Sequence, residues 1–178
     1  SKKMLGDYEQ NYEKIPKEIF HFPSSINEDS LIELIRENKI DYIFFLGGGI
    51  AKSKLINSPK FKTVNFHSGV SPYYNGNKTI FHAFKNKDFN LIGGTLMYMT
   101  EKIDGGSILM HTFPSIDEVD NSSTLFLKNI ELSIQAIIQF TEEHIKKGYS
   151  PLSVIQDEPK YYLKNIDWDI RDDIKLSK

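Results

Sequence analysis

Apolar residues recur at helical spacing in two stretches of the chain. Between Thr124 and Lys147 they return every three or four residues, and a shorter series follows Asn27. We expect an amphipathic helix in both places, with Asn27 as the N-cap of the earlier one. Two short helices are expected at residues 50–59 and 79–87.

Strands are predicted where short apolar runs are bounded by glycine or polar residues. Such runs cover residues 41–46, 63–67, 93–100 and 107–113. The run at 41–46 is almost wholly apolar, which is typical of a strand buried on both faces. A further short strand is expected at residues 19–22. Because strands alternate with helices, the pattern predicts an α/β fold with a mostly parallel sheet.

Three unusual loops each follow an expected strand. They are the triple glycine 47–49, the loop at 68–78 and the loop at 100–106. In open α/β sheets, ligands bind outside the carboxyl ends of the strands. If the strands are parallel neighbours, the three loops meet at one edge, and we expect the chemistry of the protein there.

Asn65, His67 and Asp104 are the candidate chemical groups. Asn65 and His67 alternate with apolar residues, so their side chains share one face of the strand. A carboxylate beside the imidazole would orient it and stabilise its positive charge. An amide and an imidazolium on one face supply two donors to one oxygen, as a developing oxyanion requires. These residues indicate transfer of a group at a carbonyl by direct attack of an amine.

Simpler interpretations of the same residues stay open. An imidazole at a strand end can be a hydrogen-bonded structural group, and Asp104-Gly105-Gly106 is also a common turn sequence. The triple glycine 47–49 lacks the spacing of a dinucleotide fingerprint or a P-loop. It is either a tight turn or a backbone against which a flat ligand lies.

Composition excludes several classes of protein. Lys and Arg number 22 against 24 Asp and Glu, so there is no basic excess for binding nucleic acid. Cysteine is absent, which removes disulfides and thiolate zinc sites, and the sequence has no HExxH motif. No apolar run has the length of a membrane span. We expect a cytoplasmic protein with a single core and without a metal, a membrane or a nucleic acid as partner.

Three segments together resemble the folate-dependent formyltransferases. They are NFHSGVSPYYNG at 65–76, GGTLMYMTEKIDGGSIL at 93–109 and DYIFFLGGGIAKSKL at 41–55. The resemblance implies a Rossmann-like formyltransferase domain, a transferase activity, and 10-formyltetrahydrofolate as co-substrate without a metal.

The resemblance also implies roles for individual residues. Asn65, His67 and Asp104 correspond to the family's catalytic Asn, His and Asp. The residues expected to hold the folate are Gly47, Gly48, Gly49, Ile50, Glu101, Lys102 and Ile103. The residues expected to bind the acceptor are Ser68, Tyr74 and Gly76.

The resemblance divides the chain into a catalytic domain at 1–148 and a C-terminal extension at 149–178. The family's first strand–helix unit is not recognisable upstream of Ile19, so the N-terminal part is expected to be incomplete or atypical. The extension contains KYYLKNIDWD and is most similar to the branch that formylates nucleotide-linked amino sugars. A homodimer would be consistent with the apolar helix and the aromatic tail.

The expected reaction is therefore formylation of a primary amine, with a nucleotide sugar as the acceptor. Formylation of phosphoribosylglycinamide is an alternative, and so is a non-catalytic module that binds folate or a nucleotide. The tRNA-directed branch normally carries a further C-terminal barrel domain, and only about thirty residues follow Gly148 here. That branch is disfavoured on this ground.

Overall fold

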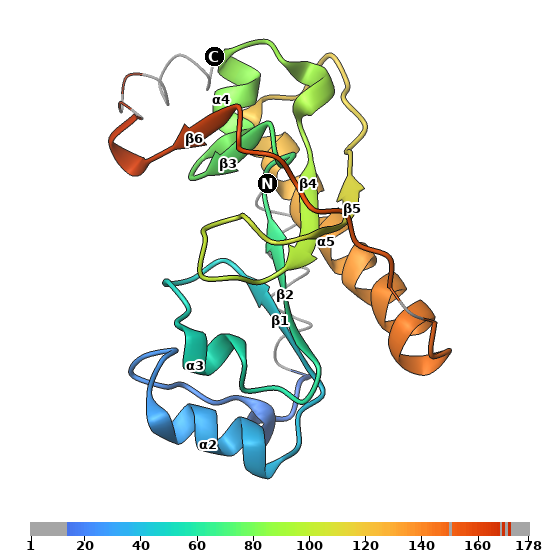
Figure 1. Cartoon of the computed structure of the whole chain (residues 1–178). Coiled ribbons are helices and arrows are strands. Elements are labelled where there is room, and N and C mark those ends of the chain that lie inside the picture. The colour runs from blue at the N-terminus through green and yellow to red at the C-terminus, as the bar shows by residue number, and fades with distance from the viewer. Residues whose placement is uncertain (1–13, 150, 168, 170, 172–178) are drawn as a thin grey trace.

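Four strands form the central sheet of the computed structural model, in the order β1-β2-β4-β5 (Figure 1). The structure describes residues 14–149, 151–167, 169 and 171. The strands are β1 (Tyr42–Leu46), β2 (Lys62–His67), β4 (Gly94–Tyr98) and β5 (Ile108–Thr112). Each lies within one of the runs predicted from the sequence or matches it to within one residue, and the α/β fold class is confirmed.

The prediction of a mostly parallel sheet is wrong. Within the central sheet only β1 and β2 run parallel, whereas β4 is antiparallel to both β2 and β5. The connection from β2 to β4 contains α4 (Thr79–Lys85) and the 3₁₀ turn η2 (Phe89–Leu91). It returns the chain to the end of the sheet at which β2 finishes, where Thr95 pairs with His67, so β4 runs in the opposite direction.

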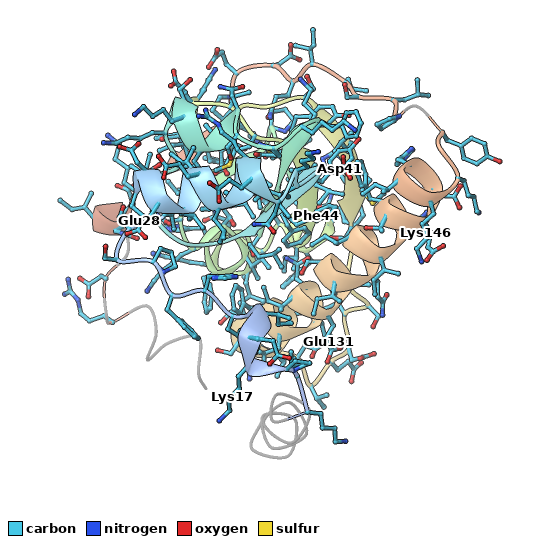
Figure 2. The ribbon with its side chains drawn as sticks, turned by 90° about the horizontal axis from the view of Figure 1, so that it is seen from below. Lys17, Glu28, Asp41, Phe44, Glu131 and Lys146 are labelled. Carbon is cyan, nitrogen blue, oxygen red and sulfur yellow. The ribbon has the colours of Figure 1, made fainter. Side chains whose placement is uncertain are left out.

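Helices cover both faces of the sheet. On one face, α2 (Asp29–Glu37) and α3 (Ser53–Ile56) pack against Ile43 and Phe45 of β1. On the other face, α5 (Ser122–Phe140) places Phe140 against Phe44, with the rings edge to face and their centroids 5.9 Å apart. Figure 2 labels Phe44 between the sheet and this helix. Val64 and Phe66 of β2 belong to the α5 side, so Asn65 and His67 face the side of α2 and α3.

Several local predictions need correction. The side chains of β1 are only partly buried because β1 is an edge strand, not a strand covered on both faces. Residues 17–19 form a 3₁₀ turn, η1 (Lys17–Ile19), and the strand expected at 19–22 is absent. The N-cap of α2 is Glu28. Asn27 instead donates to the Ile50 carbonyl at 2.8 Å and accepts from the Lys52 amide at 2.7 Å.

The predicted long helix is α-helical only in its first part. Asn121 caps α5 by accepting from the amides of Ser123 and Thr124, at 3.0 and 3.1 Å. After Phe140 the helix continues as a π-helical segment, η3 (Thr141–Lys146). None of the helices in the described ranges is long and apolar enough to cross a membrane.

The C-terminal extension packs back onto the domain. Val154 exchanges two backbone hydrogen bonds of 2.8 Å with Ile108 of β5. Further on, β6 (Tyr161–Leu163) runs parallel to β3 (Tyr74–Gly76), and a last 3₁₀ turn, η4 (Asn165–Asp167), follows. Neither β3 nor β6 was expected from the sequence. Between residues 14 and 41 there is no strand, and residues 1–13, where part of the missing unit would fall, lie outside the described residues.

Candidate active site

The loop at 99–107 lies over the face of the sheet that carries Asn65 and His67. Because β4 is antiparallel to β2, this loop begins beside the start of β2, where the Met99 amide bonds to the Thr63 carbonyl at 2.9 Å. It then folds back, and the Tyr98 amide bonds to the Ser107 carbonyl at 3.0 Å. Figure 1 shows the loop between β4 and β5 crossing in front of β2. The three predicted loops do meet, but the third arrives across the face and not along the edge.

The loop brings the Asp104 carboxylate to both donors of β2. The carboxylate Oδ2 lies 3.3 Å from His67 Nδ1, and Oδ1 accepts from Asn65 Nδ2 at 3.4 Å. The backbone N–H of Gly76 also donates to Oδ2, at 2.8 Å. The side chains of His67 and Asp104 are 6% and 10% exposed, so this charge pair is largely shielded from water. The carboxylate therefore accepts two N–H hydrogen bonds and also contacts the imidazole.

The imidazole of His67 is held at both nitrogens. Its Nε2 lies 2.8 Å from the Tyr74 carbonyl, and a carbonyl oxygen only accepts, so Nε2 carries a proton. Nδ1 faces the carboxylate of Asp104. In this conformation both ring nitrogens are engaged within the protein. Asn65 is the donor most readily turned toward a ligand, because its hydrogen bond to Asp104 is long.

Asp104 has a backbone conformation that needs support. Its φ is +49°, in the left-handed region that residues other than glycine rarely adopt. The Asp104 carbonyl accepts from Asn75 Nδ2 at 3.0 Å and from Gln156 Nε2 at 2.8 Å. At Gly106, a Cβ would lie 1.6 Å from the Tyr98 carbonyl oxygen, so only glycine fits. These constraints set the direction in which the carboxylate points.

A cleft of about 800 Å³ opens above this cluster. Its walls are the glycine loop after β1, the loop around Asp104, the start of α4, and β6 with the residues that follow it. The predicted site residues that line it are Gly47, Gly48, Gly49, Ile50, Asn65, His67, Ser68, Gly76, Glu101, Lys102, Ile103 and Asp104.

Tyr74 is the exception, and its predicted contact with the acceptor is corrected. The residue has no exposed surface and packs in the core with Ile80 and Leu125. Its hydroxyl donates to Asp88 at 2.5 Å. Tyr74 supports the site through its carbonyl, which holds His67, because strand β3 turns its side chain away from the cleft.

The buried Tyr74 hydroxyl makes stability sensitive to alkaline pH. Burial, together with the hydrogen bond to Asp88, raises the pKa of Tyr74 to about 12. An unfolded tyrosine ionises near pH 10, so the stabilisation is complete below pH 10 and is lost as the pH rises toward 12. We expect the free energy of unfolding to fall less steeply over pH 10–12 in Tyr74→Phe than in the wild type, in urea titrations. An equal slope in both proteins would contradict this assignment.

Several residues of the site were not predicted. Asn75 and Gln156 hold the Asp104 carbonyl, and Gly69 leaves room for the bond between His67 and Tyr74. A Cβ on Gly69 would lie 2.4 Å from His67 Nε2 and 2.5 Å from the Tyr74 oxygen. The glycine two residues after a candidate histidine is a local signal that sequence reasoning could have used. Gln156 gives no such signal, since it is distant in sequence from the other site residues and belongs to none of the motifs.

The cluster has the parts needed for acyl transfer. Asn65 supplies an N–H donor beside a carboxylate, and that carboxylate can accept a proton from an attacking nucleophile. The imidazole of His67 contacts the same carboxylate, with Nδ1 3.3 Å from Oδ2. Among the described residues, no three His, Asp or Glu side chains gather as metal ligands would.

Comparison with known proteins agrees with this description. The family model described as formyl transferase matches residues 1–141. A methionyl-tRNA formyltransferase from Mycoplasmopsis pulmonis is 32% identical over 127 residues, which are 70% of this chain and 43% of that protein. The chain thus spans less than half the length of this curated relative.

Two solved structures share the fold. A 4-N formyltransferase from Francisella tularensis superposes with a TM-score of 0.66 at 22% identity, over 82% of this chain and 57% of that one. The formyltransferase PseJ from Anoxybacillus kamchatkensis, in complex with UDP-4,6-dideoxy-4-formamido-L-AltNAc and tetrahydrofolate, superposes with a TM-score of 0.61 at 19% identity. That match covers 93% of this chain and 82% of PseJ. The family match over most of its length, together with the shared fold, makes this chain a member of the formyl transferase family.

Proposed function

We propose that the chain transfers a formyl group from 10-formyltetrahydrofolate to a primary amine. The observation that carries the proposal is the convergence of Asn65, His67 and Asp104, with the carboxylate 3.4 and 3.3 Å from its two partners, at the base of a cleft. The amine nitrogen forms a bond to the formyl carbon, and Asn65 donates to the oxyanion that develops. His67 stabilises the same charge, and can donate directly by exchanging its bond to Tyr74.

Asp104 is proposed to carry the proton from the attacking amine to the leaving group. The attacking amine becomes acidic as its bond to carbon forms, and its proton passes to the carboxylate. The bond between the formyl carbon and folate N10 then breaks, and the proton is delivered to N10. The products are a formamide and tetrahydrofolate, and Asp104 returns to its ionised state. No residue needs to form a covalent intermediate.

The cleft suits a flat donor between two stretches of backbone. Gly47 and Gly48 have φ values of +69° and +114°, so this loop exposes backbone without side chains at those positions. The residues 101–103 line the cleft together with this loop. The pterin ring is proposed to lie between them, and PseJ, which shares the fold, is described in complex with tetrahydrofolate.

For the acceptor we propose a nucleotide-linked amino sugar. Lys78 and Lys164 line the cleft and bring positive charge to the wall where phosphates are proposed to lie. Tyr162 of β6 lines the same wall, is 45% exposed and offers an aromatic face to a base. PseJ is described with a UDP-linked 4-formamido sugar, which favours this class. The cytoplasmic location and the homodimer remain predictions.

A panel of amines tests the proposed acceptor. The protein is incubated with 10-formyltetrahydrofolate carrying a ¹³C-formyl group, and the formamide is followed by NMR. We expect product with UDP- or dTDP-linked amino sugars and none with the same nucleotide sugars bearing a hydroxyl in place of the amine. Product from phosphoribosylglycinamide or methionyl-tRNA alone would place the chain in another branch. Folate binding by calorimetry without transfer to any amine would indicate a binding module.

A further inference from the structure

Gln156 is the one described residue of the C-terminal extension whose side chain hydrogen-bonds to the backbone of the Asp104 turn. Its Nε2 donates to the Asp104 carbonyl at 2.8 Å and to the Gly106 carbonyl at 2.6 Å. Both carbonyls can only accept, so the orientation of the amide is fixed by its partners. One side-chain nitrogen thereby bonds to two carbonyls of the turn that carries the proposed catalytic carboxylate.

The chain around Gln156 is anchored on both sides of the turn. Two residues earlier, Val154 is paired with Ile108 on the edge of the central sheet. Four and five residues later, the amides of Lys160 and Tyr161 donate to the carbonyls of Pro72 and Tyr73, at 2.8 and 2.9 Å. The segment therefore crosses from β5 to β3 with backbone hydrogen bonds before and after Gln156, which fix its position.

The backbone conformation of the turn depends on hydrogen bonds from other parts of the chain. A residue other than glycine at positive φ persists only where the surroundings fix it, and Asp104 is at +49°. Among the described residues, its carbonyl accepts hydrogen bonds from two side chains, those of Asn75 and Gln156. The peptide orientation that they set determines where the carboxylate points, and the partners of that carboxylate are His67 and Asn65.

The side chain of Gln156 is poorly suited to a role in stability alone. Its Oε1 is buried without a hydrogen-bond partner in the described part of the chain. A buried acceptor without a donor costs free energy that an apolar side chain would avoid. What an amide adds over an apolar side chain is the pair of N–H bonds to the turn.

We propose that Gln156 is a positioning residue, which locks the Asp104–Gly106 turn so that the carboxylate meets His67 and Asn65. The inference rests on the proposed formyl transfer. Gln156 lies beyond residue 141, where the family match ends. The extension is therefore part of the apparatus that orders the active site.

Gln156→Met tests the proposal, since it keeps the length of the side chain and removes both N–H donors. We expect kcat for formyl transfer to fall about tenfold or more, with the KM values for donor and amine within about threefold, because a misplaced catalytic group lowers the chemical step. The matched control is Asp157→Asn, a neighbouring exposed residue, which should keep the wild-type kcat. An unchanged kcat in Gln156→Met, or a rise in KM alone, would overturn the proposal.

A double-mutant cycle separates positioning from a general loss of structure. If Gln156 acts through Asp104, adding Gln156→Met to Asp104→Asn should lower kcat by less than about twofold further, whereas independent effects multiply. Multiplied losses would refute the assignment. If thermal unfolding shows that Gln156→Met is not folded, Gln156→Asn replaces it in the cycle. The amide of this variant is one methylene too short to reach the turn.

A second readout does not depend on activity. In protein labelled with ¹⁵N-histidine, Gln156→Met should shift the ring signals of His67, assigned with His67→Gln, and Asp157→Asn should leave them unchanged. Unchanged His67 signals in Gln156→Met would contradict the positioning role. If the wild type transfers no formyl group but Gln156→Met still shifts the His67 signals, the proposed function is disproved. The positioning of the Asp104–Gly106 turn by Gln156 is then still supported.

Discussion

Asp104→Asn is expected to lower kcat for formyl transfer by at least about a hundredfold, the scale seen when a general acid–base group or an oxyanion donor is removed. The amide has nearly the same shape as the carboxylate but cannot take the proton of the attacking amine. It also has only one oxygen for the donors of His67, Asn65 and Gly76. His67→Ala should cause a loss of similar size, because the imidazole that contacts Asp104 and is proposed to stabilise the oxyanion is gone.

The measurement is the steady-state rate of formamide production at saturating folate and amine. Asp41→Asn is the matched control, since it makes the same change at an exposed carboxylate that pairs with Lys60 at 3.7 Å. It should keep the wild-type rate to within about twofold. Wild-type rates in both Asp104→Asn and His67→Ala would reject the mechanism.

Gly76→Ala is expected to lower the free energy of unfolding by about 3 kcal/mol, as the sum of two separate costs. Gly76 has a φ of +98°, which costs an alanine about 1–2 kcal/mol. The new Cβ would lie 2.0 Å from the Leu163 carbonyl oxygen of β6, and relieving such crowding typically costs about 1–3 kcal/mol. Any shift of β3 also moves the Gly76 amide that donates to Asp104, so kcat should fall in the protein that remains folded.

Gly148→Ala isolates the backbone cost from the crowding. Gly148 has a φ of +74°, and a Cβ there would meet nothing within 4 Å. Urea unfolding of this variant should show a loss of about 1 kcal/mol, with kcat unchanged. Equal losses of stability in Gly76→Ala and Gly148→Ala would mean that crowding of the new Cβ against the Leu163 carbonyl adds no cost.

The elements predicted correctly are those with a strong local pattern. The strand at Lys62–His67 alternates apolar and polar residues, and this period alone places Asn65 and His67 on one face. The long helix was expected from its apolar spacing, although its π-helical end was not. The three-residue strands Tyr74–Gly76 and Tyr161–Leu163 are too short for any periodicity to show.

The features missed depend on contacts between distant parts of the chain. The direction of β4 depends on the end of the sheet to which the chain returns after α4, and the apolar pattern of a strand is the same in either direction. Tyr74 was assigned to the acceptor with its neighbours in the resembling segment, yet its strand pairs with that of Tyr161 and its ring lies in the core. Asp104 was a candidate from its loop after an expected strand and from the family resemblance, whereas its hydrogen bond to Gln156 joins segments 52 residues apart and has no local pattern.

The central claim is that one carbonyl fits among Asn65, His67 and Asp104. It is tested most directly by a crystal structure of the protein with a stable formyl-tetrahydrofolate bound. We predict that the formyl oxygen lies about 3 Å from Asn65 Nδ2, within hydrogen-bond distance, with the pterin against the glycine loop. A formyl group bound elsewhere in the cleft, beyond the reach of Asn65 and His67 while Asp104 keeps its present partners, would contradict the account.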